Sequence, residues 1–186
     1  MILVRHGQSE FNVHFAKTRQ DPGIADPSLT DEGRRQAAQA AEVVRAFDIR
    51  HVMASPFTRA LQTAEIIAGA LKLPVEIEPL VHEHAAFVCD IGTPASELGK
   101  RWPGWRFDHL PERWWPEAEE EHEMLSRCER FRDRMATAEF YDHTVIVSHW
   151  GFIRGLTGLR VTNGAVVRVA KQGEAELLHP LEAALS

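Results

Sequence analysis

Four short apolar runs are spaced along the chain, separated by turn residues or by longer amphipathic segments. They cover residues 2–4, 51–54, 74–77 and 144–147. Branched apolar residues dominate the first and the last run, which is typical of strands buried on both faces of a sheet. We therefore predict four short strands, the last of which ends at Ser148.

Helical periodicity fills the intervals between the first three runs. Residues 34–47 repeat apolar side chains at helical spacing, and Thr30 is a candidate N-cap for this helix. A second helix is predicted to start at Ser55, with Pro56 in its first turn and an apolar side along residues 60–71. Strands that alternate with helices predict an α/β fold with a mostly parallel sheet.

Three further segments follow other patterns. Residues 84–116 carry prolines, glycines and four of the five tryptophans without clear periodicity, and they are interpreted as an excursion between two strands. The tryptophans of residues 102–115 either form a lid over a pocket or pack the excursion onto the body, and packing is favoured. The charged run 117–139 predicts a long surface helix, and residues 161–178 predict a terminal hairpin at a sheet edge.

The length and charge of the chain narrow the functional classes. A chain of 186 residues suits one domain with its own hydrophobic core. The 21 basic and 27 acidic residues give a net charge of −6, whereas binding to nucleic acid or to an anionic membrane needs an extended basic surface. A small anionic substrate stays compatible with this charge, because one local pocket can override the mean field.

The two cysteines, Cys89 and Cys128, are far apart in the sequence. The N-terminus lacks the pattern of a secretion signal, and no apolar stretch is long enough for a membrane-spanning helix. We therefore expect two free thiols in a cytoplasmic protein, with a disulfide as the less favoured alternative.

Histidine and arginine side chains follow three of the predicted strands. Arg5, His6 and Gly7 come directly after the first strand, Arg59 follows the second and His149 follows the fourth. The carboxyl ends of parallel strands share one edge of a sheet, so these side chains are expected to form one positive site. A neutral imidazole is a competent nucleophile, and guanidinium donors match phosphate oxygens.

Each motif also has an ordinary structural interpretation. His6 could belong to a helix-capping turn, Arg59 could pair at the surface with Glu65, and His149 could bond to the backbone at a strand end. Two histidines and two arginines at one sheet edge are much less expected by chance than any of them alone. The combination therefore favours phosphate chemistry.

The order of these motifs resembles the histidine phosphatase superfamily, the phosphoglycerate mutase-like proteins. The resemblance covers Leu3–Asn12, Asp26–Thr30 with Gly33 and Gln36-Ala37, Ser55–Ala64 and Val147–His149. It implies a three-layer α/β sandwich with a mostly parallel central sheet and helices on both faces. It also implies a single domain over residues 1–186, with an insertion at about 84–116 that borders the active site.

The resemblance makes His6 the catalytic nucleophile that becomes phosphorylated. The Gly7 segment is expected at the phosphate-binding site, where it would fix the tautomer of His6 by accepting a hydrogen bond from its other ring nitrogen. Arg5, Arg59 and His149 are implied as catalytic groups that bind the phosphoryl oxygens, with Asn12 assisting. Two guanidiniums and a protonated His149 would supply the positive charge, so neither a metal nor another cofactor is expected.

The leaving alkoxide needs a proton, and the resemblance implies that Glu83 supplies it. Residues 80–84 stand where the family carries its acid, although His82 replaces the arginine of the commoner pattern. Near other acids in a partly closed site, Glu83 is expected to have a raised pKa, to donate its proton and then to activate water. A solvated carboxylate is the alternative interpretation.

Two further clusters carry weaker hypotheses. A zinc site would start from the His-x-His pair His82 and His84, with His109 or His122 as further ligands, although nothing completes it. The insertion contributes few basic groups that could contact a second anionic group of a substrate, namely Lys100, Arg101, Arg106 and Arg113.

These observations predict a metal-independent histidine acid-type phosphatase that hydrolyses a small phosphorylated metabolite through a phosphohistidine. Mutase-type phosphotransfer and a non-catalytic phospho-ligand or protein-binding relative are the alternatives. The family's mutases are typically longer chains, which favours the phosphatase. The expected partner is the small phosphorylated substrate, with no nucleic acid and no membrane, and a homodimer is one candidate oligomeric state.

Overall fold

A six-stranded sheet runs through the middle of the molecule in the order β3-β2-β4-β1-β5-β6. The computed structural model describes residues 1–179, so residues 180–186 of the predicted domain lie outside the described part. The strands are β1 (Ile2–Arg5), β2 (His51–Ala54), β3 (Val75–Ile77), β4 (Thr144–Ser148), β5 (Val166–Val169) and β6 (Ala175–His179). The first four pair in parallel and the last two are antiparallel, which confirms the mostly parallel sheet and the edge hairpin.

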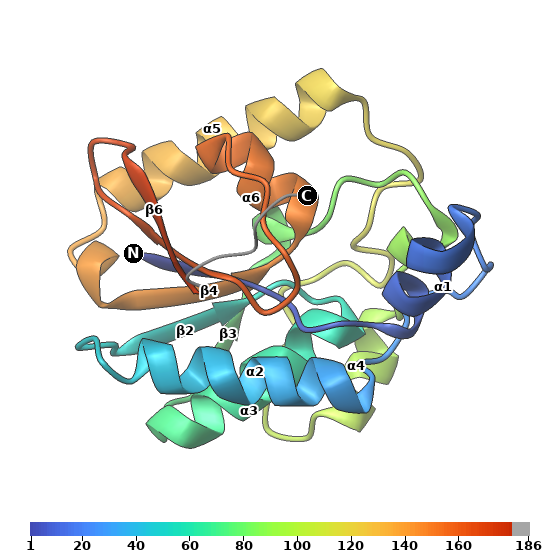
Figure 1. Cartoon of the computed structure of the whole chain (residues 1–186), viewed down its shortest axis with the longest axis horizontal. Helices are drawn as coiled ribbons and strands as arrows, with labels where there is room; N and C mark the ends of the chain where they lie inside the picture. The colour runs from blue at the N-terminus through green and yellow to red at the C-terminus, as the bar shows by residue number, and fades with distance from the viewer. Residues whose placement is uncertain (180–186) are drawn as a thin grey trace.

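Helices cover both faces of this sheet (Figure 1), which confirms the three-layer arrangement. The six helices are α1 (Glu10–Thr18), α2 (Asp31–Val44), α3 (Thr58–Leu71), α4 (Ala95–Arg101), α5 (Glu121–Ala136) and α6 (Trp150–Thr157). Short 3-10 turns follow β3 and precede β4, namely η1 (Pro79–Val81), η2 (Val88–Asp90) and η3 (Tyr141–His143). Helices α2 and α3 lie on one face, and α5 and α6 lie on the other.

Alternating side chains of the strands build a separate core on each face of the sheet. In β1, Val4 belongs to the core under α2 and α3, whereas Leu3 belongs to the core under α5 and α6. In β4, Val147 belongs to the core under α2 and α3, and Ile146 belongs to the core under α5 and α6. Burial on both faces explains why these strands are short, continuous apolar runs in the sequence.

Strand register brings three functional segments to one edge of the sheet. Arg5 is paired with Ser148, and Ala54 is paired with Val147. The hydrogen bonding continues one residue further, because the His6 N–H donates to the Ser148 carbonyl at 2.9 Å. The residues that follow β1, β2 and β4 therefore leave the sheet side by side.

Two predicted helix boundaries are wrong. Helix α3 begins at Thr58, so Pro56 lies outside it, because the Asp26 carboxylate accepts from the Thr58 backbone N–H at 2.8 Å and from its hydroxyl at 2.6 Å. Helix α5 covers Glu121–Ala136 and not the whole of 117–139. The helix begins after Glu120, the N-cap, whose backbone N–H donates to the Glu123 carboxylate at 2.8 Å.

Helix α1 carries an N-terminal signal that the sequence analysis did not use. Ser9 and Asn12 form a capping box, in which each side chain accepts from the backbone N–H of the other. Such a pair satisfies two of the N–H groups that a helix start leaves open. The capping box also fixes where Phe11 and Phe15 of this helix lie.

The tryptophans of the insertion pack against the body, as the favoured interpretation predicted. Trp102 and Trp114 are buried in the core under α2 and α3, with Trp105 and Trp115 packed against it. The Trp114 indole N–H donates to the Thr93 carbonyl at 2.9 Å. This bond satisfies the one polar group of that ring, so the segment is anchored.

Both cysteines are buried free thiols, which confirms the prediction for Cys89 and Cys128. Within residues 1–179, no helix combines the length and apolar character that a membrane span needs.

Two glycines let the loop after β1 lie directly on the start of α2. A Cβ on Gly33 would come within 2.0 Å of the Gln8 carbonyl oxygen, and a Cβ on Gly7 would come within 2.1 Å of the Gly33 oxygen. Backbone atoms cannot move aside as a flexible side chain can. Only glycine therefore fits this contact, which positions the loop that carries His6.

We expect Gly33→Ala to lower the free energy of unfolding by about 1–3 kcal/mol, because the added methyl group overpacks a backbone contact. Thermal or urea unfolding measures this change. Gly69→Ala is the matched control, since Gly69 is exposed in α3 and its Cβ would meet nothing within 4 Å. That control should be neutral or slightly stabilising. Equal stability of the two variants would contradict the close contact.

Candidate active site

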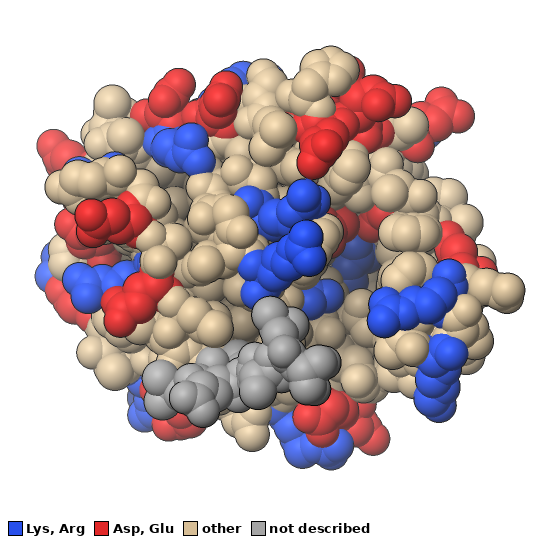
Figure 2. All heavy atoms as spheres, turned by 45° about the horizontal axis from the view of Figure 1, so that its top comes forward, with Lys and Arg blue, Asp and Glu red and all other residues tan. Residues whose placement is uncertain are grey.

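A cavity of about 490 Å³ opens at the carboxyl edge of the parallel strands. Figure 2 shows Lys and Arg side chains gathered beside a hollow near the middle of one face. The cavity is lined by predicted site residues together with an aromatic group: Arg5, His6, Asn12, Arg59, Glu83, Phe11, Phe15, Phe87 and Trp150. The insertion borders the cavity only with its first residues, 84–90. The lining residues from this segment are His84, Ala86, Phe87, Cys89 and Asp90.

The His6 side chain is 2% exposed and held in one orientation. Its Nδ1 lies 2.7 Å from the Gly7 carbonyl oxygen, which can only accept, so Nδ1 carries the proton. Burial, followed by the charges of Arg59 and Arg5, holds the pKa of His6 well below its ordinary value. The ring is therefore neutral, and Nε2 keeps its lone pair.

His149 lies against His6, with ring centroids 5.0 Å apart. Its Nε2 lies 2.8 Å from the Ser55 hydroxyl oxygen, which joins the ends of β2 and β4. Burial, followed by the charge of Arg59, holds the pKa of His149 well below its ordinary value. Burial therefore disfavours a charged His149 in the protein without a bound anion, and protonation of His149 beside a bound phosphoryl group stays a prediction.

Arg5 and Arg59 approach the cavity from different elements. Arg5 donates from Nη1 to the Val161 carbonyl at 2.7 Å. Arg59 is 3% exposed and donates to the Cys89 carbonyl at 2.8 Å and to Asp90 at 3.0 Å. The alternative of a surface pair with Glu65 is wrong, because Arg59 turns inward from α3.

Two buried side-chain nitrogens in residues 1–179 lack a hydrogen-bond partner, and both lie in this cluster. They are Arg5 Nε and His149 Nδ1. A buried polar atom without a partner costs about 1–3 kcal/mol, so nearly all such atoms in folded proteins are paired. Their occurrence here, in two residues with predicted anion-binding roles, marks the cluster as a ligand site.

Asn12 turns its amide nitrogen away from the protein network. Its Oδ1 accepts from the Ser9 backbone N–H at 2.9 Å, from the Ser9 hydroxyl at 3.0 Å and from the Asn163 amide at 3.1 Å. These bonds use the carbonyl end of the side chain, and Asn12 also lines the cavity. Asn163 is a supporting residue that the sequence analysis missed.

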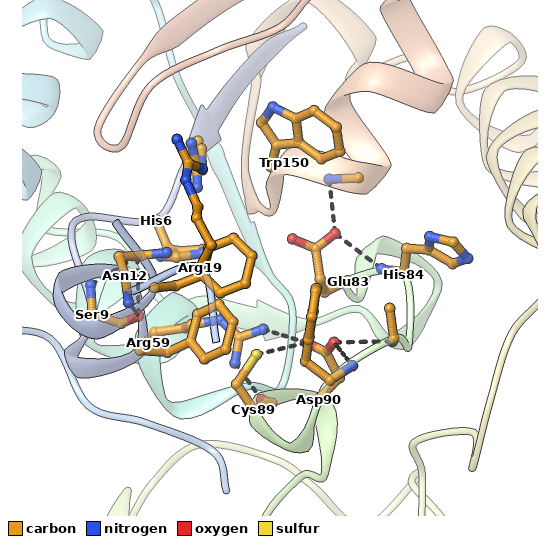
Figure 3. A pocket seen from close by; sticks show the side chains of 16 residues that line it. His6, Ser9, Asn12, Arg19, Arg59, Glu83, His84, Cys89, Asp90 and Trp150 are labelled. Atoms are coloured by element: carbon orange, nitrogen blue, oxygen red, sulfur yellow. Dashed lines mark hydrogen bonds and ion pairs between the residues drawn. The ribbon is translucent and has the colours of Figure 1, made fainter. Parts of the chain in front are cut away.

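Glu83 lies at the opposite side of the cavity, below Trp150 (Figure 3). Its Oε1 accepts from the Gly151 N–H at 2.7 Å and from the His84 N–H at 2.9 Å, while its second oxygen points toward the cavity. A Cβ on Gly151 would come within 2.4 Å of Oε1, so this glycine in the first turn of α6 permits the bond. Burial, and then the charge of Asp90, raises the pKa of Glu83, as expected.

Asp90 is a further site residue that sequence reasoning missed. One carboxylate oxygen pairs with Arg59, and the other accepts from the backbone N–H groups of Ala86 and Phe87, both at 3.1 Å. It therefore ties the cavity wall to α3 and places a second negative charge near Glu83. Nothing in the local sequence marks this acid, because its partner lies thirty-one positions away.

Arg127 of α5 holds the segment that carries Glu83. Its guanidinium donates to the Leu80 carbonyl at 2.7 Å, to the His82 carbonyl at 2.9 Å and to both oxygens of Glu119. The Ser148 hydroxyl adds a bond of 2.7 Å from β4 to the Val81 carbonyl. A guanidinium from another element thus supports the segment in which His82 stands.

Neither the basic residues of the insertion nor the histidines of the zinc hypothesis form a site in residues 1–179. The basic residues of the insertion do not line the cavity; three of them pair locally with acids, namely Lys100 with Glu97, Arg106 with Asp108 and Arg113 with Glu117. The structure therefore places none of these four groups at the cavity. Among residues 1–179, no group of three or more His, Cys, Asp or Glu side chains is arranged to hold a metal ion, and His82 and His84 instead bond to carbonyl groups.

Comparison with known proteins places the fold and the site in one family. The sequence model of the histidine phosphatase superfamily, branch 1, matches residues 1–166. The chain belongs to the histidine phosphatase superfamily. Residues 1–166 include β1, β2, β4 and every side chain of the site described above.

Relatives of this histidine phosphatase carry two kinds of name. A probable phosphoglycerate mutase of Proteus mirabilis is 33% identical over 152 residues, covering 80% of this chain and 68% of the relative. A probable phosphatase of Schizosaccharomyces pombe is 32% identical over 113 residues, covering 58% of this chain and 51% of the relative.

Solved structures confirm the fold. A mycobacterial glucosyl-3-phosphoglycerate phosphatase superposes with a TM-score of 0.65 at 21% identity, covering 96% of both chains. A phosphoserine phosphatase of Entamoeba histolytica superposes with a TM-score of 0.61 at 23% identity, covering 95% of this chain and 93% of the other.

We expect Arg127→Met to lower the free energy of unfolding by about 3–5 kcal/mol, because it leaves the buried Glu119 carboxylate unpaired. Urea unfolding measures the loss. Arg130→Met on the same helix is the matched control, since Arg130 is exposed and bonds only to Ser126. The control should change stability by less than about 0.5 kcal/mol. A loss in Arg127→Met as small as in the control would contradict the supporting role of this ion pair.

Proposed function

We propose that this histidine phosphatase hydrolyses phosphomonoesters of small metabolites through a phosphohistidine on His6. The observation that carries the proposal is the unpaired state of Arg5 Nε and His149 Nδ1 beside a neutral His6. A phosphoryl group at this position would supply oxygen acceptors for both nitrogens. Family membership supports the same reaction, and the similar mycobacterial phosphatase is described in complex with VO3.

The first step transfers the phosphoryl group to the protein. The His6 Nε2 lone pair attacks phosphorus, the N–P bond forms and the P–O bond to the leaving alcohol breaks. Arg5 and Arg59 balance the charge on the phosphoryl oxygens, with His149 and Asn12 as further donors. Glu83 gives its proton to the leaving oxygen, and burial, which raises the pKa of Glu83, favours the protonated form that this step needs.

The second step returns the protein to its starting state. The Glu83 carboxylate takes a proton from water, the water oxygen attacks phosphorus and the N–P bond breaks. Inorganic phosphate leaves, His6 is neutral again and Glu83 carries its proton. The sum is one phosphomonoester and one water converted into an alcohol and phosphate, and no step in this scheme calls for a metal ion.

Mutase-type transfer is the second candidate, because several relatives are named probable phosphoglycerate mutases. In that case the phosphohistidine would return its phosphoryl group to a hydroxyl of the product and not to water. Phosphorus NMR of 3-phosphoglycerate incubated with the protein separates the two, since a mutase yields 2-phosphoglycerate and a phosphatase yields free phosphate. A homodimer and a cytoplasmic location also stay proposals, which sedimentation and cell fractionation would test.

We expect His6→Ala to abolish acid-labile phosphorylation and to lower phosphomonoester hydrolysis at least about 10³-fold, because the nucleophile is lost. Labelling by a radioactive phosphodonor and a metabolite hydrolysis screen measure the two effects. His14→Ala is the control, since His14 is an exposed histidine of α1. A wild-type protein that neither labels nor hydrolyses any phosphomonoester would overturn the proposal.

The charge of Asp90 should set the upper pH limit of the phosphorylation step. Asp90 raises the pKa of Glu83, so Asp90→Asn lowers that pKa and Glu83 loses its proton at a lower pH. The basic limb of the pH profile of kcat/KM should therefore move to lower pH. Asp108→Asn, at an exposed acid paired with Arg106, is the control and should leave the profile unchanged. An unmoved limb in Asp90→Asn would argue against Glu83 as the acid.

A further inference from the structure

Aromatic rings wall the cavity on the side of α1 and of the segment before η2, and a further ring, that of Trp150, lies above Glu83 (Figure 3). Phe11 and Phe15 come from α1, Phe87 comes from the segment before η2, and Trp150 is the first residue of α6. The three phenylalanine rings touch one another, with centroid separations of 5.2 Å for Phe11–Phe15, 5.4 Å for Phe11–Phe87 and 5.3 Å for Phe15–Phe87. We call these four residues the aromatic wall.

The wall is fixed in place before any ligand binds. Phe11 and Phe15 are four residues apart, so they lie on the same side of a helix whose start is held by a capping box. The Phe87 backbone N–H donates to Asp90, the same carboxylate that pairs with Arg59. A preformed wall costs little ordering on binding, which is how rigid aromatic side chains contribute affinity.

The wall also leaves apolar surface exposed to solvent. The Phe87 side chain is 43% exposed, although the rings of Phe11 and Phe15 pack against it. Unlike the similarly exposed Leu125, Phe87 lines the cavity, so its exposed ring surface faces the space that a ligand would fill. The apolar surface is therefore available to the group that the phosphate is attached to.

Charge is scarce along this wall. Among residues 1–179, Arg19 is the one Lys or Arg that lines the cavity apart from Arg5 and Arg59. It is exposed at the end of α1, and its guanidinium lies 5.9 Å from the centre of the Phe15 ring. A substrate with a carboxylate or a second phosphate would meet one solvated cation, whereas an apolar group would meet four aromatic rings.

We infer that the aromatic wall selects phosphomonoesters whose alcohol part is apolar, above all one that carries an aromatic ring. The inference rests on the proposed function, since it describes the leaving group of that reaction. Phe15 and Phe87 are its specificity-determining residues. A ring bound against them would stack or meet them edge to face while the phosphate lies at His6.

Paired phosphonates test the wall independently of catalysis, because the C–P bond is not hydrolysed. Propylphosphonate and 3-phenylpropylphosphonate differ only by the ring, and calorimetric titration gives the ratio of their affinities. We expect the phenyl compound to bind about tenfold more tightly to the wild type, in line with the discrimination that apolar pockets achieve. Phe87→Ala and Phe15→Ala should each reduce this ratio several-fold, because they weaken binding of the phenyl compound more than binding of propylphosphonate.

Leu125→Ala is the matched control, because Leu125 is 42% exposed on α5 and does not line the cavity. It should keep the wild-type ratio. Equal affinities in the wild type, no binding of either compound, or a ratio that survives both phenylalanine substitutions would overturn the inference.

The corresponding phosphate esters separate the two proposals. The two alcohols have similar acidity, so any difference in kcat/KM reports on the wall. Hydrolysis of both esters at equal kcat/KM, together with equal phosphonate affinities, would overturn the aromatic wall alone. Selective binding of the phenylpropyl compound without hydrolysis of either ester would overturn the phosphatase proposal alone.

Discussion

Parallel pairing of β1 with β4 and of β4 with β2 is the constraint on which the rest of the site depends. The pairing of Arg5 with Ser148 makes His6 and His149 leave the sheet next to each other. The pairing of Ala54 with Val147 brings Ser55 to the Nε2 of His149. Residues far apart in the sequence thus meet without a long loop. A shift of this register by one residue would turn every strand side chain to the other core, so the apolar pattern that stabilises the two cores also fixes the site.

Burial then sets opposite protonation states on the two sides of the cavity. It lowers the pKa values of His6 and His149 and raises that of Glu83, because it disfavours the charged form of each group. The result is a neutral nucleophile facing a protonated acid, which is the pair that phosphoryl transfer to nitrogen requires. Arg5 and Arg59 supply the positive charge, so an acidic chain with a net charge of −6 still offers one cationic position.

The sequence predicts the strands and the site residues whose position is determined by neighbouring residues in the chain. Apolar runs locate the strands, and the residues directly after them locate His6, Arg59 and His149. Asp90 and Arg127 escape prediction because their partners lie 31 and 47 positions away. The start of α3 was misplaced for the same reason, since Asp26, 32 positions before Thr58, decides where that helix begins.

Asp90 connects the two ends of the cavity through a single carboxylate. One oxygen holds Arg59 and the other holds the backbone of Phe87, so the phosphate-binding arginine and the aromatic wall share an anchor. An anion that reaches Arg59 competes with Asp90 for the same guanidinium. The same carboxylate accepts a hydrogen bond from the Phe87 backbone, and its charge raises the pKa of Glu83. The residues proposed for phosphate binding, leaving-group contact and proton donation therefore share one neighbour, the Asp90 carboxylate.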